Sequence, residues 1–440
     1  MILIPKETAV WIPLTIQTSN EELLNVTRAH GEYLFDEKGE AYVDGVASWW
    51  TSIHGHCHPN ITKAITNQAT ELDHMMLAGM IHAPAESLAK KILFLTEGDF
   101  HKVFYSDNGS NAVEIALKIA VQFFKNNGKV EETKKESFIT FSASYHGDSI
   151  GAMNVSGITY FNRIFSALRF PTKEFLAPNC LSCPFLKKPE SCQVECLDSL
   201  EAELKENAFQ YAGVIIEPLV FGAGGMIFFD KKVLVRLEEL CHSYNILFIL
   251  DEVFTGMGRT GKAFAYQQAN IKPDLVAMAK GLTGGSLPLA ATLITKKIYE
   301  SFLSEDPYAS FFHAHTMTGN PIACAAGIAS IDLLQSEGYD SVAKLTLQLE
   351  DLLFRLAKHF PEKIKNPRVL GAIAAFEWQE PIAEDEYLNP IGKRLKRELF
   401  QHKVLLRPLG STVYITPPYN IGASALEQIY KGLFEALTIL

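Results

Sequence analysis

The sequence has little that would suit a membrane, a disulfide framework or a nucleic acid. Its longest apolar runs, such as Ile246–Leu250, fall far short of the about 20 residues that a membrane-spanning helix needs. Only seven cysteines occur among 440 residues, which favours thiols or metal ligands over a disulfide framework. The 40 basic residues against 50 acidic ones give a net charge of -10, which disfavours nucleic-acid binding.

A secretory leader is not expected either. The first residues, MILIPKETAVWIP, lack a basic start, a long apolar segment and a small-residue cleavage site. The chain also shows no internal repeat and no segment of low complexity. Its 48% hydrophobic and 20% charged residues are typical of a globular protein. We therefore expect a globular, cytoplasmic protein with more than one domain.

Short β-rich runs alternate with helical patterns along the middle of the chain. A strand is expected at 102–107, and the helix predicted at 111–124 has a broad apolar face. A second helix is expected at 230–244, with Asp230 as its N-cap. Further strands are expected at 137–142, 213–217, 245–251, 274–280 and 290–295. This alternation predicts an α/β fold with a mostly parallel sheet covered on both faces.

The predicted sheet defines the expected domain organisation. We assign residues 55–325 to a large domain that contains the sheet. The two flanks, residues 1–54 and 326–440, are expected to form one smaller α+β domain from both ends of the chain. Ligands of open α/β sheets bind at the carboxyl ends of the strands, so residues that directly follow a predicted strand are the first candidates for a site.

A carboxylate and an amine follow two of these strands. Asp251 ends one apolar run, and Lys280 ends the run DLVAMAK. A charged group at the end of a buried strand is costly unless another group pairs with it, so the two side chains are expected to share a pocket. They could form a buried salt bridge. They could also form a pyridoxal phosphate site, in which lysine binds the cofactor covalently and aspartate holds its pyridine nitrogen.

Two turns could complete such a site. Gly109 and Ser110 lie between a strand and a helix, where backbone N–H groups and a hydroxyl can bind a phosphate. Tyr145 follows the next strand and could stack on a planar ring. Each turn taken alone also fits an ordinary helix cap or a half-buried tyrosine.

The motifs occur together and in a fixed order: SDNGSNAVEIALK, YHGD, IIEP, LDEVFTGMGRTG, PDLVAMAKGLTGG and HTMTGNPIACAA. In this order they resemble the class III pyridoxal-phosphate aminotransferases of fold type I, and the similarity extends from about Trp11 to Tyr419. The resemblance implies pyridoxal 5'-phosphate as the cofactor, transamination in two half-reactions, and a homodimer with active sites at the subunit interface.

The resemblance also implies roles for the matching positions. Lys280 would bind the cofactor and transfer the proton, Asp251 would bind the pyridine nitrogen, and Tyr145 would stack on the ring. The other positions implied at the cofactor are Gly109, Ser110, Glu217, His315 and Thr316, with Thr316 reaching the phosphate of the neighbouring subunit. Asp148 and Arg259 are implied to lie directly behind these residues.

Within the family, the segments VDGVASWWTSIHGHCHP, AKGLTGGSLPLAATL and LLRPLGSTVYITPPY most resemble the branch that aminates 8-amino-7-oxononanoate in biotin biosynthesis. The implied substrates are this keto acid and an amino donor, commonly S-adenosylmethionine and in a known variant lysine. Trp49, Trp50, Tyr145 and Lys280 would line the substrate tunnel, and Arg407 would bind the carboxylate. An apolar tunnel that ends in one cation suits a long mono-acid.

Two segments depart from the family pattern. Members often have Trp-His-Pro-Tyr-Thr near the start, with the tyrosine contacting substrate, whereas this chain has Leu14 at the tyrosine position. The loop often written His-Gly-Pro-Thr reads His313-Ala314-His315-Thr316 here. Leu14, Ala314 and His315 therefore bear on the choice of amino donor rather than on the type of reaction.

Other functions remain open at this point. The chain could be a class III aminotransferase of ω-amino acids or a related aminomutase, although the tandem tryptophans and Arg407 suit a long mono-acid better. It could also be a binding or scaffold protein that retains the fold without catalysis. The motif residues Lys280, Asp251, Ser110 and Tyr145 argue against that alternative.

Two histidine and cysteine clusters could hold metal. The run His54-Gly55-His56-Cys57-His58 is interpreted as a structural loop, because adjacent alternating residues seldom converge on one ion. Four cysteines have the spacing of structural zinc sites, namely Cys180, Cys183, Cys192 and Cys196. Plain thiols and a structural zinc site are both compatible with that spacing, and no catalytic metal is expected.

Overall fold

The computed structural model describes residues 4–127, 132–157, 161–379 and 390–440. Its largest element is a seven-stranded sheet in the order β4-β12-β11-β10-β7-β5-β6. The strands are β4 (Lys102–Ser106), β12 (Ala290–Ile294), β11 (Leu275–Met278), β10 (Leu247–Asp251), β7 (Tyr211–Ile216), β5 (Ser137–Phe141) and β6 (Thr172–Phe175). Only β12 runs antiparallel to its neighbours in this sheet. The prediction of an α/β fold with a mostly parallel sheet is confirmed.

Both faces of the sheet are buried, as β10 illustrates. Leu247 and Ile249 belong to one apolar cluster with α4, whereas Phe248 and Leu250 belong to another with α7. Because successive side chains of a strand point to opposite faces, a strand between two layers of helices must be apolar at every position. This is why residues 246–250 form a continuous hydrophobic run.

Helices cover these faces and connect the strands. They are α2 (Pro59–Glu71), α3 (Ala83–Leu95), α4 (Gly109–Asn126), α5 (Ile150–Asn154), α6 (Asp198–Asn207), α7 (Lys232–Ser243), α8 (Tyr266–Ala269), α9 (Lys296–Glu300) and α10 (Pro321–Leu333). The N-cap prediction for Asp230 was wrong, because Lys231 occupies that position. The Asp230 carboxylate still accepts a hydrogen bond from the Lys232 N–H at 2.8 Å.

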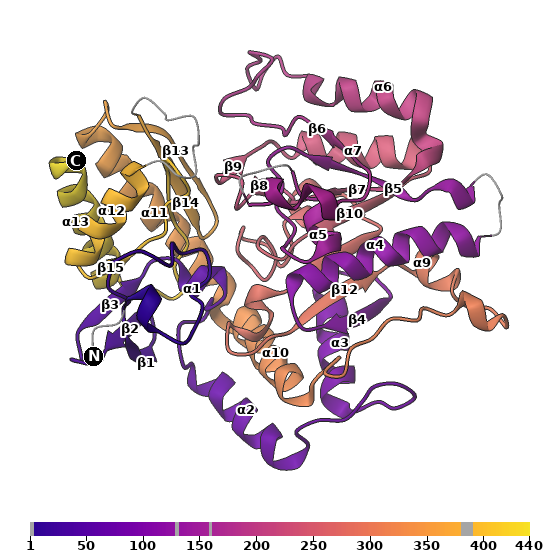
Figure 1. Ribbon diagram of the computed structural model, residues 1–440, viewed down its shortest axis with the longest axis horizontal. Coiled ribbons are helices and arrows are strands. Elements are labelled where there is room, and N and C mark those ends of the chain that lie inside the picture. Colours follow the sequence, from indigo (N-terminus) through magenta and orange to yellow (C-terminus); the bar gives the residue numbers. More distant parts are fainter. Residues whose placement is uncertain (1–3, 128–131, 158–160, 380–389) are drawn as a thin grey trace.

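A smaller part contains segments from both ends of the chain. It has the sheet β1-β2-β3-β15, the sheet β13-β14-β16 and helices α11 to α13. Their bounds are β1 (Val26–His30), β2 (Tyr33–Asp36), β3 (Ala41–Asp44), β13 (Ile364–Leu370), β14 (Ile373–Trp378), β15 (Val404–Leu405), β16 (Thr412–Ile415), α11 (Tyr339–His359), α12 (Pro390–Gln401) and α13 (Ala423–Ile439). Figure 1 shows this part on the left and the seven-stranded sheet on the right.

The pairing of β3 with β15 brings residues near position 43 beside residues near position 404. The domain bounds 1–54, 55–325 and 326–440 stay a prediction. The boundary at 326 falls inside α10, which packs against α2 and α3.

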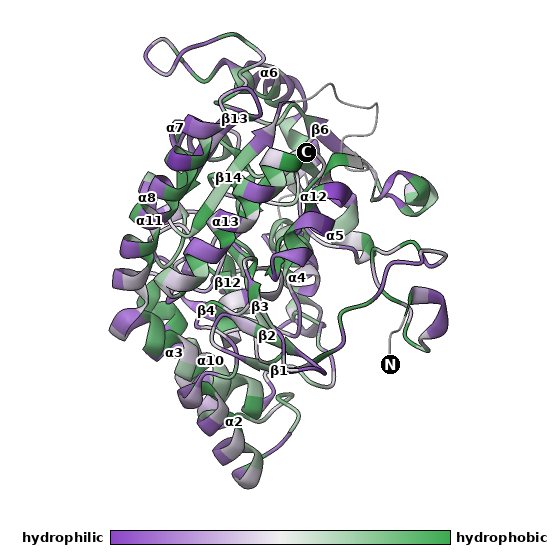
Figure 2. Ribbon diagram, turned by 90° about the vertical axis from the view of Figure 1, so that its left-hand side faces the viewer, coloured by the Kyte–Doolittle hydropathy of each residue, from purple (hydrophilic) through white to green (hydrophobic). Residues whose placement is uncertain are grey.

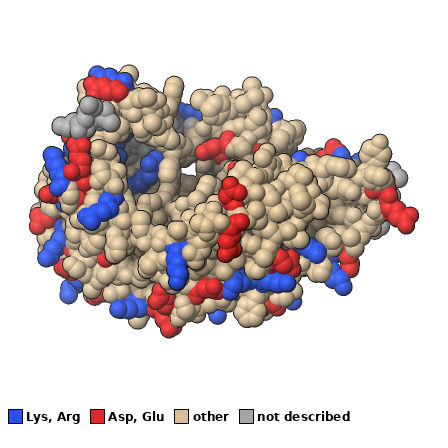
Figure 3. All heavy atoms as spheres, turned by 90° about the horizontal axis from the view of Figure 1, so that it is seen from below, with Lys and Arg blue, Asp and Glu red and all other residues tan. Residues whose placement is uncertain are grey.

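The surface carries both charges, and many of the outer helices are amphipathic. Helices at the outer edge show alternating hydrophilic and hydrophobic segments (Figure 2). Seen from below, the molecule is hollowed between its two parts, with basic and acidic side chains interspersed on this face (Figure 3). Among the described residues, no helix combines the length and the apolar character that crossing a membrane requires.

Candidate active site

A cavity of about 460 Å³ lies where β7 and β10 end and α4 begins. This is the position that the topology of an open α/β sheet predicts for a ligand. The cavity is lined by residues that the sequence had singled out, namely Trp50, Gly109, Ser110, Tyr145, Glu217, Asp251 and Lys280. The structure therefore brings the predicted anion site, carboxylate and amine to one place.

The start of α4 forms a compact turn that suits an anion. Asn108 caps the helix, since its side chain accepts a hydrogen bond from the Asn111 N–H at 2.9 Å. Ser110 Oγ accepts a hydrogen bond from the Asp148 N–H at 3.3 Å. Gly147 makes this close approach possible, because a Cβ there would lie 2.0 Å from Ser110 Oγ. Backbone N–H groups at a helix start, together with a serine hydroxyl, favour a bound phosphate.

The Asp251 carboxylate is held in a defined orientation. His146 Nδ1 lies 2.7 Å from Asp251 Oδ2, and the Val253 N–H donates to Asp251 Oδ1 at 3.0 Å. Asp251 and His146 are both buried. The other ring nitrogen of His146 is buried without a hydrogen-bond partner among the described residues. A fixed, buried carboxylate can hold a proton on a neighbouring aromatic nitrogen.

Glu217 is a second buried carboxyl group at the cavity. Its oxygens accept hydrogen bonds from the Tyr145 and Gly222 N–H groups, each at 3.0 Å. Burial, and then the charge of Asp251, raise the pKa of Glu217 to about 7. Glu217 therefore fixes the backbone at Tyr145, whose ring forms one wall of the cavity.

Lys280 begins a short 3-10 helix and has a positive φ of 41°. Its Nζ lies 4.6 Å from the centre of the Trp50 ring and 5.8 Å from that of Phe254. Burial lowers the pKa of this amine, while the charges of Asp251 and Glu217 oppose the effect. A lysine that is neutral more readily than usual is a better nucleophile toward a carbonyl group.

Of the two predicted tunnel tryptophans, Trp50 lines the cavity, whereas Trp49 and Arg407 are not among its lining residues. Arg407 Cζ lies 4.3 Å from the centre of the Trp49 ring. Arg259 is buried and donates hydrogen bonds to the carbonyl oxygens of Trp50 at 3.3 Å and Pro417 at 3.0 Å. Arg259 thus acts on the backbone of the tryptophan segment rather than on the cavity itself.

Other predicted residues lie outside the cavity of one chain. Leu14, Ala314 and Thr316 are exposed and do not line it. His315 is nearer, with Nε2 3.9 Å from Oδ1 of Asp107, a lining residue. Their predicted roles remain untested, and exposure of Thr316 is what a contact with a second subunit requires.

Two features of the site were missed from the sequence. The pairing of His146 with Asp251 joins the segment after β5 to the last residue of β10, and β7 lies between these two strands in the sheet. Phe254 lies against Lys280 although nothing in its local pattern indicates a ligand site. Phe254 could have been proposed from its place just after Asp251, whereas the histidine contact needed the strand order.

The four cysteines of the predicted zinc spacing lie close together in the structure. The four side chains border one small cavity, and all are free thiols, as are the other cysteines. Across the described part of the chain, no group of three or more His, Cys, Asp or Glu side chains is arranged to hold a metal ion. The structure does not decide between plain thiols and a structural zinc site, and both interpretations of the spacing stay predictions.

The arrangement fits one cofactor chemically. Pyridoxal phosphate has a phosphate, a pyridine nitrogen and an aldehyde, for which the α4 turn, Asp251 and Lys280 are suitable partners. The close contact of Gly147 with Ser110 keeps the phosphate turn compact. Fold and site together define a pyridoxal-phosphate-dependent transferase.

The chain belongs to the class III aminotransferase family, whose members depend on pyridoxal phosphate, since the model of that family matches residues 15–437. The adenosylmethionine-8-amino-7-oxononanoate aminotransferase of Geobacter sulfurreducens is 41% identical over 97% of this chain and 95% of that protein. The Staphylococcus aureus protein of that name is 40% identical over the same shares.

Solved structures agree with this assignment. The adenosylmethionine-8-amino-7-oxononanoate aminotransferase of Methanocaldococcus jannaschii has a TM-score of 0.89 and 32% identity, covering 98% of this chain and 97% of that one. An amine transaminase from an uncultivated Pseudomonas species has a TM-score of 0.91 and 28% identity, covering 98% and 99%. The resemblance to fold type I aminotransferases is confirmed.

Proposed function

We propose that this enzyme converts 8-amino-7-oxononanoate to 7,8-diaminononanoate by transamination, as a step of biotin biosynthesis, with S-adenosylmethionine as the amino donor. The relatives named above support this substrate and this donor. The observation that carries the proposal is the row of groups from Lys280 past Trp50 and Trp49 to Arg407. Apolar walls and a terminal guanidinium match a long chain that ends in a carboxylate.

Each residue at the cofactor has a distinct task in this proposal. Pyridoxal phosphate, when bound, supplies an electron sink for the carbon that loses or gains a proton. Lys280 holds the cofactor and then carries that proton on Nζ. Asp251, oriented by His146, keeps the pyridine nitrogen protonated, and Tyr145 covers the ring. Gly109 and Ser110 bind the phosphate.

The residues at the end of the proposed tunnel away from Lys280 suit an acceptor with one carboxylate. Arg407 binds the carboxylate, and stacking on Trp49 limits the directions in which its guanidinium can point. Trp50 excludes water beside Lys280. Leu14 has no side-chain hydrogen-bond donor, so the contact that the family tyrosine makes is absent or comes from another group. Lysine remains the alternative donor.

A homodimer is part of the proposal. Tyr308 and Phe312 are 88% and 76% exposed on the segment that leads to Thr316, which is also exposed. Large exposed aromatic side chains near a predicted site are typical of an interface. In the dimer, Thr316 of the partner subunit binds the cofactor phosphate. Location in the cytoplasm stays a prediction.

The test separates the proposed reaction from its alternatives. The purified holoenzyme is mixed with S-adenosylmethionine, lysine or an ω-amino acid, and the cofactor absorbance is followed in each half-reaction. 8-amino-7-oxononanoate is then added and 7,8-diaminononanoate is measured by mass spectrometry. Product with S-adenosylmethionine supports the proposal, whereas turnover of ω-amino acids without this product would assign the enzyme to the amine transaminases.

A further inference from the structure

The two tunnel tryptophans lie on one turn of left-handed helix. This turn, α1 (Ala47–Trp50), has φ values of 46°, 44°, 68° and 75° at its four residues. None of them is glycine, and L-residues in this region suffer contacts between Cβ and the backbone. Such strain persists only where surrounding structure holds the backbone in place, and it concentrates at functional sites.

Asp44 holds the start of the turn. Its Oδ2 accepts hydrogen bonds from the Ser48 N–H at 2.6 Å and from Ser48 Oγ at 2.8 Å, and its Oδ1 accepts one from the Val46 N–H at 3.3 Å. Asp44 is 2% exposed, so water competes little for these bonds. One carboxylate therefore fixes three groups at the entry of the left-handed turn.

The side chain of His56 orients the Asp44 carboxylate. Its Nε2 donates to Asp44 Oδ2 at 2.9 Å. The His56 backbone is itself fixed, because it exchanges two hydrogen bonds with Gly31, at 2.7 Å and 3.0 Å. Its ring therefore approaches Asp44 from an anchored position. The chain Gly31–His56–Asp44–Ser48 links the β1–β2 hairpin to the tryptophan turn.

The left-handed turn connects Asp44 and His56 to both ends of the proposed tunnel. Trp50 lies against the Lys280 amine, and Trp49 stacks on the Arg407 guanidinium. Arg259 donates a hydrogen bond to the Trp50 carbonyl oxygen at the end of the turn. The direction of both indole rings therefore depends on the left-handed backbone between Asp44 and Arg259.

We propose that Asp44 and His56 are positioning residues that set the affinity for the acceptor substrate by holding the left-handed turn, and with it Trp49 and Trp50, in place. Neither residue lines the cavity. The inference rests on the proposed function, because it concerns the acceptor of that reaction. It predicts an effect on KM for the keto acid, while the Lys280 chemistry persists.

The test compares His56→Leu and His56→Gln with the native holoenzyme. The leucine variant removes the donor to Asp44, so KM for the keto acid is expected to rise about tenfold, the loss that one hydrogen bond to a charged group produces. The glutamine side chain restores an N–H donor, so its KM is expected to return toward the native value. kcat and the cofactor absorbance at the lysine are expected to change little.

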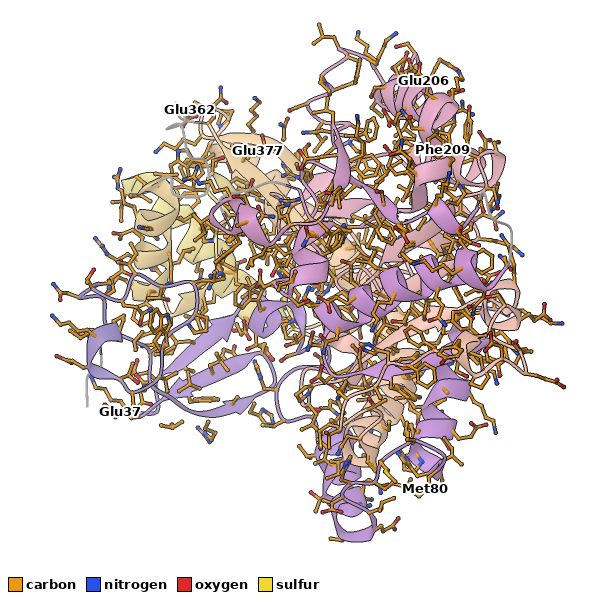
Figure 4. All side chains as sticks on the ribbon, turned by 45° about the vertical axis from the view of Figure 1, so that its right-hand side comes forward. Glu37, Met80, Glu206, Phe209, Glu362 and Glu377 are labelled. Atoms are coloured by element: carbon orange, nitrogen blue, oxygen red, sulfur yellow. The ribbon has the colours of Figure 1, made fainter. Side chains whose placement is uncertain are left out.

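A control removes a comparable interaction elsewhere. Glu377, labelled in Figure 4, lies on β14 and pairs with the buried Arg368 at 3.1 Å. Glu377→Gln is expected to lower the unfolding temperature without raising KM. Asp44→Asn provides a second variant at the turn, and near-ultraviolet circular dichroism of each holoenzyme reports the environment of the tryptophans.

The outcomes separate the inference from the proposed function. If the native enzyme fails to aminate the keto acid, the proposed function fails. The positioning roles are then judged by the circular dichroism and by KM for the acceptor it does use. If His56→Leu and Asp44→Asn leave KM and the tryptophan signal at native values, or if His56→Gln is as impaired as His56→Leu, the inference is overturned.

Discussion

Replacing Arg407 by alanine is expected to weaken binding of the keto acid while the chemistry at Lys280 continues. A hydrogen bond to a charged group contributes about 1.5–3 kcal/mol, and each 1.36 kcal/mol corresponds to a factor of ten. These values convert to a rise in KM of about 10- to 150-fold. Arg407 is only partly buried, and solvent screens its charge, so we expect the lower part of that range, about 10- to 50-fold.

The assay uses the aminated holoenzyme with 8-amino-7-oxononanoate or with its methyl ester, which lacks the carboxylate charge. The native enzyme should prefer the acid, and Arg407→Ala should lose most of this preference, because the ester offers no carboxylate to the guanidinium. Arg355→Ala serves as the control, since Arg355 pairs with Glu427 at 3.1 Å on the surface of α11 and α13. Equal losses for acid and ester would refute a carboxylate contact and leave Arg407 as a support for Trp49.

Three further outcomes are expected. Lys280→Ala should abolish turnover and the visible absorbance of lysine-bound cofactor, and survival of either would exclude the assigned role. Gly147→Ala should reduce cofactor retention on dialysis about tenfold or more, because the new Cβ would lie 2.0 Å from Ser110 Oγ and displace a phosphate ligand; unchanged retention would show that the turn can relax. Burial lowers the pKa of His54 to about 4 from 6.5, so the unfolded state binds the proton first and stability falls as pH drops from about 6.5 to about 4, by about 3 kcal/mol. In urea titrations across this range, His54→Gln should show a flatter dependence on pH than the native protein.

The fold was largely predictable because the buried strands have a simple pattern. Residues 246–250 are apolar throughout, and the structure buries them, with successive side chains of β10 on opposite faces of the sheet. β6 was missed because three of its four residues, Thr172, Lys173 and Glu174, are polar and lie on an edge strand. An edge strand has one neighbour only and can be polar, as β6 is, so hydrophobicity did not reveal this strand.

The site was predictable where it depends on strand ends and less so where it depends on strand order. Asp251 ends β10 and Lys280 follows the parallel strand β11, which places both residues at the same edge of the sheet. The contact of His146 with Asp251 depends on the order of the strands in the sheet, and the hydrophobic pattern does not reveal that order. The left-handed turn was also hidden, because Ala47–Trp50 contains no glycine, and its conformation comes from Asp44 and its other tertiary contacts.

The pairing of β15 with β3 has a consequence for how the enzyme is made. β3 leaves the ribosome early, whereas β15 and Arg407, two residues beyond it, are among the last parts to be synthesised. Domains tend to fold in the order of their synthesis. The seven-stranded sheet can therefore form before β15 is available to pair with β3. A nascent chain can therefore form the cofactor pocket before it acquires Arg407, the cation that we propose binds the substrate. Truncation near the C-terminus would then produce a protein that binds cofactor but cannot select its acceptor.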